Sequence, residues 1–417
     1  MKNHDIDVLI IGAGVTGLSA AQLLEARHFD VCLIEASHRI GGRAYSEQFS
    51  NGSWFDLGCS YLHEGEINPF SSIAYKLGFK LGDGNRFDRN KLKMIINGKG
   101  ANKNDLLSFQ KFEDNFINTM VEMSSSYIAG HGDDMASAID WNHKFAPLYS
   151  HLMSGLNASD VTDQSVTDYL KSGFGLDYPV VDGFGRLILA WAKEFINKVP
   201  CHLNCSVKEI DWSDGHIKVN TNKGLIKARK VLITVSTGVM NSGQIKFLPN
   251  LPEEIEEAFY NLPCGCMNKI GLSFLTDTFG EDEAGWHNIF CDQDQENVRT
   301  GSFDINIDDR QQAVVFVGGS ESIYLERQGG DALKSYAVER IVEAFGSKIK
   351  SKINGHITTA WGEDGFTLGS YSYARPGCSL ARQTIGKCIE ELIYFAGEAA
   401  SVKHFGTCHG AYLSGVE

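Results

Sequence analysis

The stretch Val8-Leu-Ile-Ile-Gly12-Ala-Gly14-Val-Thr-Gly17 decides the fold of this chain. Its first four residues are apolar and mostly β-branched, which predicts a buried strand. The Leu- and Ala-rich residues 18–26 predict a helix, and the apolar residues 31–34 predict a second strand that ends on Glu35. Strand, G-x-G-x-x-G, helix, strand and acid, in this order, form the βαβ fingerprint of a dinucleotide site.

Each part of this fingerprint has its own physical task. Gly12 permits the tight turn, Gly14 lets a pyrophosphate approach the backbone, and Gly17 lets the helix pack closely on the strand. The start of the helix directs its free N–H groups and its dipole at the phosphates. Glu35 can accept hydrogen bonds from the ribose hydroxyls of an adenosine. NAD and FAD both satisfy this pattern.

The length of 417 residues predicts two domains. A hydrophobic content of 43% and a charged content of 22% are typical of a globular protein. The net charge of −14 argues against nucleic acid as a partner and favours cationic substrates weakly. A negative charge that only keeps the protein soluble is an equally good explanation.

The expected location is the cytoplasm. The first strand follows acidic residues rather than a secretory signal, and no apolar stretch is long enough to span a bilayer. The ten cysteines show no disulfide spacing, which suits a reducing compartment. No metal is expected, because the close pairs Cys201/Cys205 and Cys264/Cys266 lack a partner pair with zinc-finger spacing.

Gly41, Gly42 and Arg43 come shortly after Glu35. Adjacent glycines let the backbone bend around a ligand, and the arginine fork suits a phosphate, although a solvated surface loop would also fit. Together with the fingerprint, this segment resembles the two-dinucleotide-binding-domain flavoproteins and, among them, the flavin-containing amine oxidases. The resemblance implies FAD rather than NAD.

Residues 54–65 resemble the D-x-G-A-S-W-I-H-G segment of that family, which runs past the flavin ring and implies a cofactor contact at Ser60. Cys59 replaces the usual alanine, and Tyr61 replaces the usual tryptophan. His63 falls where polyamine oxidases place a histidine or an acid near the substrate. We therefore expect Tyr61 and His63 in the substrate pocket, with a structural loop histidine as an equal alternative for His63.

The middle of the chain carries less information. Residues 76–182 lack a phosphate-binding signature, and the apolar spacing of 104–126 and 139–156 predicts a mostly helical insertion that covers the substrate site. Residues 205–210 read as a strand. The backbone of Val207 matches the family position that pairs with adenine.

Lys269 lies between a helix-like stretch and the apolar strand 270–274. A lysine in such surroundings is costly to bury without partners. In related oxidases the matching lysine holds a water against flavin N5, which assists imine hydrolysis or reoxidation. The alternative is a strand-end lysine that reaches solvent.

Trp361 and Gly369-Ser-Tyr-Ser-Tyr373 resemble the family segment W-x-x-D-P-x-x-x-G-S-Y-S-Y. The resemblance implies that Tyr371 forms an aromatic wall beside the flavin and that Trp361 lies near the ring, and aromatic faces suit an amine. A half-buried strand would give the same alternation and put Tyr371 and Tyr373 on one face. The cysteine that bonds to the flavin in monoamine oxidases has no counterpart here, so we expect non-covalent FAD.

Residues 393–398 and 406–415 resemble the second flavin fingerprint of the family. Glu398 matches the acid that binds the ribityl or pyrophosphate region. The N–H groups of Thr407 and Cys408 would face the flavin N1–C2=O locus, where a helix start stabilises negative charge. Thr407 stands where monoamine oxidases have a tyrosine, so it also belongs to the expected substrate pocket.

Two further expectations concern the end of the chain. His404 and His409 are expected to be packing residues rather than catalytic bases. The resemblance implies that related chains continue along a helix beyond Glu417.

The expected fold class is α/β. A GxGxxG Rossmann-like FAD-binding domain would contain residues 5–75, 183–258 and 367–417. An interleaved α+β substrate-binding domain would contain residues 76–182 and 259–366.

The expected reaction is oxidation of an amine by hydride transfer to flavin N5. The imine then hydrolyses to a carbonyl compound, and O2 is reduced to H2O2. The acidic balance and His63 favour a polyamine-type substrate, while the oligomeric state stays open. One alternative is a flavin desaturase or porphyrinogen-type oxidase, against which Trp361 and residues 369–373 argue. Another is a silent FAD-binding scaffold or histone-tail binder, against which Lys269 and Tyr371 argue, as does Thr407.

Overall fold

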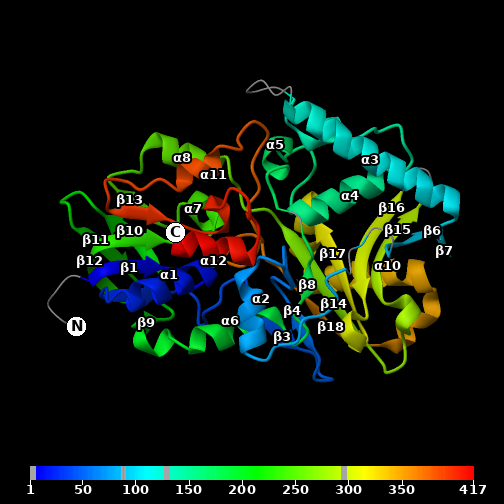
Figure 1. The fold of residues 1–417 in the computed structure, drawn as a ribbon, viewed down its shortest axis with the longest axis horizontal. Coiled ribbons are helices and arrows are strands. Elements are labelled where there is room, and N and C mark those ends of the chain that lie inside the picture. Colours follow the sequence, from blue (N-terminus) through cyan, green and yellow to red (C-terminus); the bar gives the residue numbers. More distant parts are fainter. Residues whose placement is uncertain (1–5, 86–87, 89–90, 126–131, 174, 293–297) are drawn as a thin grey trace.

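The computed structural model describes residues 6–85, 88, 91–125, 132–173, 175–292 and 298–417. Two large sheets form the two halves of the molecule (Figure 1). The strands of the first sheet come from the beginning, the middle and the end of the chain, and those of the second come from between them. The chain therefore passes between the halves several times, along the predicted interleaved division.

The first sheet has eight strands in the order β13-β10-β11-β12-β1-β2-β9, with β19 paired to β12. Its central strand β1 lies parallel to both β2 and β12. The strands are β1 (Ile6–Ile11), β2 (Val31–Ile34), β9 (Cys201–His202), β10 (Val207–Asp211), β11 (Ile217–Thr221), β12 (Gly224–Ile233), β13 (Lys246–Leu248) and β19 (Ile393–Phe395).

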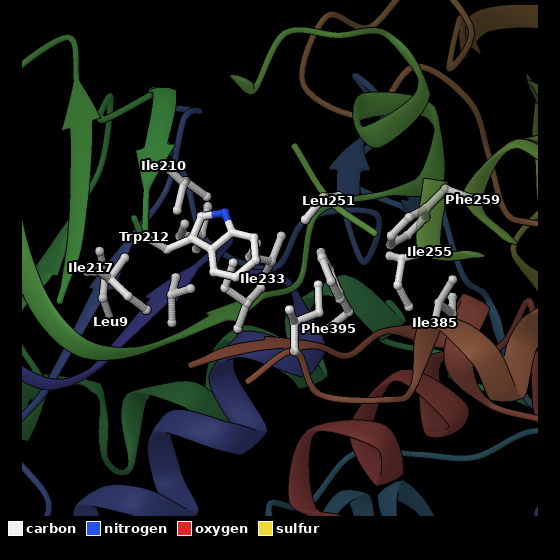
Figure 2. Packing of buried hydrophobic residues seen from close by; sticks show 14 of the residues in the cluster. Leu9, Ile210, Trp212, Ile217, Ile233, Leu251, Ile255, Phe259, Ile385 and Phe395 are labelled. Carbon is white, nitrogen blue, oxygen red and sulfur yellow. The ribbon is translucent and has the colours of Figure 1, made fainter. Parts of the chain in front are cut away.

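Both faces of this sheet are covered, which explains why β1 reads as a continuous apolar run. Leu9 and Ile11 pack into one core, whereas Ile10 packs into the core on the opposite face, as the two-residue period of a strand requires. The first core is closed by α8 (Glu253–Tyr260) and α11 (Ala381–Ile385). Figure 2 shows side chains of these helices and of the central strands in this core.

The opposite face is covered by α1 (Val15–Ala26), α2 (Pro69–Lys76) and α6 (Phe184–Lys193). The helix α12 (Cys408–Val416) packs along α1. The two helices therefore lie side by side in the first half of the molecule (Figure 1). The short helices α5 (Val166–Tyr169) and α7 (Thr237–Asn241) lie in connections.

The second sheet has seven strands in the order β18-β14-β17-β16-β15-β6-β7. One face carries α10 (Gly330–Phe345), and α4 (Ala146–Asn157) with α3 (Lys103–Ser125) contributes a separate core that includes residues of β6 and β15. Its strands are β6 (Lys93–Ile96), β7 (Lys99–Gly100), β14 (Met267–Phe274), β15 (Gly285–Cys291), β16 (Arg299–Ile305), β17 (Gln312–Gly318) and β18 (Ile353–Thr358). The remaining elements are α9 (Gly319–Gln328) and the pairs β3 (Ser46–Gln48) with β4 (Trp54–Asp56) and β5 (Tyr61–Leu62) with β8 (Tyr178–Pro179).

The insertion contains the predicted helices, but it also contains β6, which pairs with β15 and extends the second sheet. Two other details of the sequence-based expectation are wrong. The helix expected over 139–156 begins only at Ala146, where Pro147 suits the first turn of a helix. Residues 369–373 form no regular strand and make a single bridge, between Ser372 and Cys264. The predicted end of the other helix, Ser126, lies outside the described residues.

Candidate active site

A cavity of about 860 Å³ extends from the first sheet to the second. This volume lies in the upper part of the range for small-molecule and cofactor sites. All of the predicted site residues except Gly17 line it: Gly12, Gly14, Glu35, Gly42, Arg43, Ser60, Tyr61, His63, Val207, Lys269, Trp361, Tyr371, Glu398, Thr407 and Cys408. Segments that are far apart in the sequence thus meet in one site.

The three glycines of the fingerprint have different surroundings. Gly12 has φ +106°, which favours glycine, and a Cβ there would lie 2.6 Å from Oγ1 of Thr234. A Cβ on Gly17 would lie 1.9 Å from the carbonyl oxygen of Gly12, so Gly17 allows the helix to pack on the turn. A Cβ on Gly14 would meet no atom within 4 Å. The open space beside Gly14 therefore belongs to the cavity.

The start of α1 suits an anionic ligand. Gly14 is its N-cap, no side-chain cap is present, and the first turn carries no acid. Gly14, Val15 and Thr16 line the cavity, so the N-terminal end of this helix is available to a phosphate. Glu35 is fixed nearby, because its carboxylate accepts from the N–H groups of Ala13 (2.7 Å) and Ser37 (2.8 Å). These residues fit the adenosine and pyrophosphate of a dinucleotide.

Arg43 and Glu398, both predicted to contact the cofactor, pair with each other. Nη1 of Arg43 donates to Glu398 (3.0 Å) and to the carbonyl oxygen of Ser370 (2.7 Å). Glu398 also accepts from the hydroxyl of Ser372 (2.7 Å) and the N–H of Gly406 (3.0 Å). Burial alone would raise the pKa of Glu398, but the positive charges and hydrogen bonds around it lower the pKa below its usual value. Glu398 is therefore an ionised carboxylate.

A second arginine extends this network beyond the Arg43–Glu398 pair. Arg382 is fully buried and donates to Asp168 through Nε and Nη2 at 2.8–3.1 Å. Its Nη1 donates to the hydroxyl of Ser372 (2.9 Å), which in turn donates to Glu398. The buried carboxylates are thus matched by cations and hydrogen-bond donors, as buried charges require.

Lys269 lies within β14 rather than at the end of this strand, and it is only 3% exposed. The alternative of a lysine that reaches solvent is therefore wrong. Its Nζ donates to the hydroxyl of Ser60 (2.6 Å) and to the carbonyl oxygens of Asp56 (3.3 Å) and Gly58. Burial lowers the pKa of Lys269 from 10.5 to about 8, although Asp56 and Cys59 oppose this shift. An amine with this pKa can gain and lose a proton near neutral pH.

Three predicted aromatic side chains line the same cavity as Lys269. Tyr61 donates to the buried Asp304 (2.9 Å), and the indole N–H of Trp361 donates to the carbonyl oxygen of Leu57 (3.2 Å). Tyr371 donates to the carbonyl oxygen of Leu156 (2.8 Å) at the end of α4. Burial raises the pKa of Tyr371, so this phenol stays neutral. These hydrogen bonds fix the orientation of the three rings.

The insertion also contributes to the cavity. Leu152 and Leu156 of α4 line it, as do Phe109 and Glu113 of α3. The helices predicted to cover the site therefore form part of its wall.

The N-terminal end of α12 faces the cavity at Thr407 and Cys408. Thr407 is the N-cap, and its hydroxyl accepts from the N–H of Gly410 (3.0 Å). The side chain therefore caps the helix and leaves the first N–H groups for a ligand.

The imidazole of His63 is half-buried and lies 3.0 Å from Asp177. Both residues line the cavity, which is compatible with a substrate contact. His404 was expected to be a packing residue. It instead lines the cavity, and its Nδ1 lies 2.6 Å from Oε2 of Glu64. His409 is buried behind it, and its Nε2 lies 3.3 Å from the same carboxylate oxygen.

Comparison with known proteins identifies the family. The sequence matches the family described as flavin containing amine oxidoreductases over residues 15–417. The chain belongs to this family. The predicted family and the predicted α/β fold are both confirmed.

Two curated relatives from Arabidopsis thaliana illustrate the match. Probable polyamine oxidase 4 is 28% identical, and the alignment covers 100% of this chain and 86% of the relative. Lysine-specific histone demethylase 1 homolog 2 is 26% identical, and the alignment covers 98% of this chain and 57% of the relative. This chain thus spans little more than half the length of the demethylase homologue.

Solved structures support the fold of this family member. Cyclohexylamine oxidase from Brevibacterium oxydans superposes with a TM-score of 0.78 at 18% identity, over 99% of this chain and 97% of that one. Putrescine oxidase bound to putrescine superposes with a TM-score of 0.75 at 17% identity, over 99% and 98% of the two chains. In the described residues, no helix of this family member has both the length and the apolar character needed to cross a membrane.

Glu64 on the cavity wall and Asp304, which accepts from the Tyr61 hydroxyl, were not predicted from the sequence. Asp304 holds the Tyr61 hydroxyl from a different sheet, and Glu64 meets two histidines that lie more than three hundred positions later. An acid directly after the matched histidine, His63, was the available signal for Glu64. Asp304 carried no comparable local signal.

Proposed function

We propose that this protein binds FAD non-covalently and oxidises an amine to an imine, which hydrolyses to a carbonyl compound while O2 is reduced to H2O2. The observation that carries this proposal is the position of Lys269. A buried lysine with a pKa of about 8 lies on the wall of the cavity that also contains the dinucleotide fingerprint.

The cofactor would be held at three places. The start of α1 and Glu35 would bind the pyrophosphate and adenosine, with the backbone of Val207 beside the adenine. Gly42 and the Arg43–Glu398 pair would line the middle of the cofactor, and Ser60, Thr407 and Cys408 would lie near its ring. Bound FAD supplies the acceptor for the two electrons and the hydrogen that leave the amine carbon.

Lys269 would act through a water molecule. An ammonium has three donors, and three oxygen atoms already accept from this one. A water that Lys269 positions must therefore replace one of these contacts, and we assign this exchange to the Ser60 hydroxyl, which lines the cavity. The lowered pKa would let Lys269 supply or accept a proton through that water.

The aromatic rings would orient the substrate. Tyr61, Trp361 and Tyr371 offer faces that bind the apolar body of an amine and attract its cationic form. A mostly apolar surrounding also favours the uncharged amine, which is the form that can be oxidised.

We favour a polyamine-type substrate. Support comes from the relatives named polyamine oxidases and from the putrescine bound to a structure of the same fold. The net charge of −14 and the acidic residue Asp177 on the cavity wall would attract a substrate with several positive charges.

Two organisational proposals accompany this function. The division into an FAD-binding domain and a substrate-binding domain follows the membership of the two sheets. All ten cysteines are free, which supports a reducing compartment and hence the cytoplasm.

Peroxide release tests the proposed reaction. The FAD-loaded protein is supplied with air and with polyamines, acetylated polyamines, aromatic monoamines or a lysine-containing peptide, and H2O2 is measured. We expect peroxide with at least one amine and the highest rate with a polyamine. Peroxide released with apolar ring substrates and with none of the amines would overturn the proposal in favour of a desaturase or porphyrinogen-type oxidase.

A further inference from the structure

Glu64, His404 and His409 converge at one point of the structure, although two distant segments supply them. Glu64 follows β5, His404 lies in the loop before α12, and His409 lies in the first turn of α12. One ligand atom from each residue can be chosen so that all three lie within 4.8 Å of one another. The side chains are 13%, 19% and 2% exposed, respectively, so the cluster is largely shielded from solvent.

The surrounding backbone holds these groups in place. Glu64 has φ +50°, a conformation that few non-glycine residues adopt. A Cβ on Gly173 would lie 2.2 Å from the Glu64 carboxylate, and a Cβ on Gly410 would lie 1.9 Å from the carbonyl oxygen of His404. Close packing against two glycines therefore limits how far the carboxylate and the His404 loop can move. A preformed arrangement of donors is what a metal site requires.

We propose that Glu64, His404 and His409 form a binding site for one Zn²⁺ ion. Two imidazoles and one carboxylate are a donor set that zinc uses when a fourth position stays open. The fold places the site beside the cavity rather than on an unrelated surface.

One distance within the cluster matches that of a zinc site, and a second must lengthen when the ion binds. Ligand atoms about 2.0–2.1 Å from a tetrahedral zinc lie about 3.3 Å apart. Oε2 of Glu64 lies 3.3 Å from Nε2 of His409, which matches this value. The 2.6 Å contact between Glu64 and Nδ1 of His404 is a hydrogen bond, and it must lengthen by about 0.7 Å when Zn²⁺ replaces the shared proton.

An ion can reach the site from the cavity. Glu64 and His404 line the cavity wall, whereas His409 lies behind them. The fourth ligand position would therefore face the cavity and take a water molecule. The ion would also connect the loop after β5 to the start of α12, next to the predicted flavin contacts Thr407 and Cys408.

Zinc binding is tested on the FAD-loaded protein without any amine, so the result does not depend on the proposed reaction. The protein is purified without chelator, dialysed, and analysed for zinc by mass spectrometry, and Zn²⁺ is then titrated into metal-free protein by calorimetry. We expect about one zinc per chain and saturable binding. Glu64→Gln and His404→Asn should each weaken binding at least about tenfold, since loss of even an outer-shell partner can cost that much.

His28→Asn is the matched control. His28 is exposed, lies outside the cluster, and has φ +65°, which asparagine tolerates. This variant should bind zinc like the wild type, and the visible spectrum of bound FAD shows which variants are folded. Binding that is absent in the wild type, or equally strong in His404→Asn, would overturn the proposal and leave a hydrogen-bonded Glu–His network.

Discussion

Nζ of Lys269 lies 2.6 Å from Oγ of Ser60, although 209 positions separate the two residues in the sequence. The contact joins the middle of β14, in the second sheet, to the loop that follows β4. The Lys269 ammonium therefore lies where the two halves of the molecule meet, on the wall of the shared cavity. The turnover and the pH-dependent stability predicted for Lys269→Met both depend on this position.

Lys269→Met should reduce turnover by about 100-fold, the lower end of what a positioned proton-transfer group contributes. Methionine keeps the length and the apolar stem but cannot hold a water or transfer a proton. The FAD content should stay at the wild-type level, because Lys269 is remote from the predicted phosphate contacts. Flavin reduction and reoxidation are followed separately by stopped-flow absorbance. Lys246→Met, at an exposed position of β13, is the control. Unchanged rates of both steps in Lys269→Met would remove the assigned role.

The stability of the wild type should increase with pH relative to that of Lys269→Met. Between about pH 8 and pH 10.5 the folded chain has released the Lys269 proton, whereas the unfolded chain still holds it. The unfolded state then binds more protons, so rising pH favours the folded state by at most about 1.4 kcal/mol per pH unit. Below pH 8 Lys269 is protonated in both the folded and the unfolded state, so the folded state bears the full cost of burying the ammonium charge. Urea unfolding of both proteins at pH 7 to 10, at fixed FAD, measures the difference. Parallel pH profiles would show that Lys269 has an ordinary pKa.

Two glycines of the fingerprint should respond differently to the same substitution. Gly14→Ala should change the free energy of unfolding of the FAD-free protein by no more than about 1 kcal/mol, because its Cβ meets only open space and an N-cap glycine is only modestly preferred. It should nevertheless weaken FAD binding at least about tenfold, since the pyrophosphate would occupy that space. Gly17→Ala should destabilise the fold itself, because its Cβ would lie 1.9 Å from the Gly12 carbonyl oxygen. Thermal unfolding and FAD titration separate the two effects. Equal FAD affinity of Gly14→Ala and the wild type would place the cofactor elsewhere.

Acid precipitation should release the flavin. Cys59, Cys205 and Cys408 all line the cavity, so a thiol near the cofactor is available, but none matches the cysteine that carries the covalent bond in monoamine oxidases. We expect a colourless pellet and a yellow supernatant after precipitation with trichloroacetic acid. A yellow pellet would establish a covalent bond, and mass spectrometry of its peptides would identify the cysteine.

The parts of the site that could be predicted are those that a short segment determines. The turn from β1 to α1 is specified by glycines within a few residues, and the open space at Gly14 agrees with its predicted task. Lys269 was identified by its apolar neighbours, but its location inside β14 was not, because a single boundary residue is poorly determined by local pattern.

Contacts between distant segments could not be predicted in this way. Glu64 and His404 are 340 positions apart, and Tyr61 and Asp304 are 243 positions apart. Such pairs depend on how distant segments of the chain pack together, which no local periodicity reports. The late start of the helix expected over 139–156 has a local cause, since Pro147 suits a helix start better than a helix interior.

Anaerobic reduction of the bound flavin tests the central claim most directly. The FAD-loaded protein is mixed without oxygen with each member of the amine panel, and the visible flavin band is followed. We expect at least one amine, and a polyamine most rapidly, to bleach the band, and the colour to return with H2O2 when air is admitted. Failure of every amine to bleach the flavin would contradict the claim and indicate an FAD-binding protein without amine turnover.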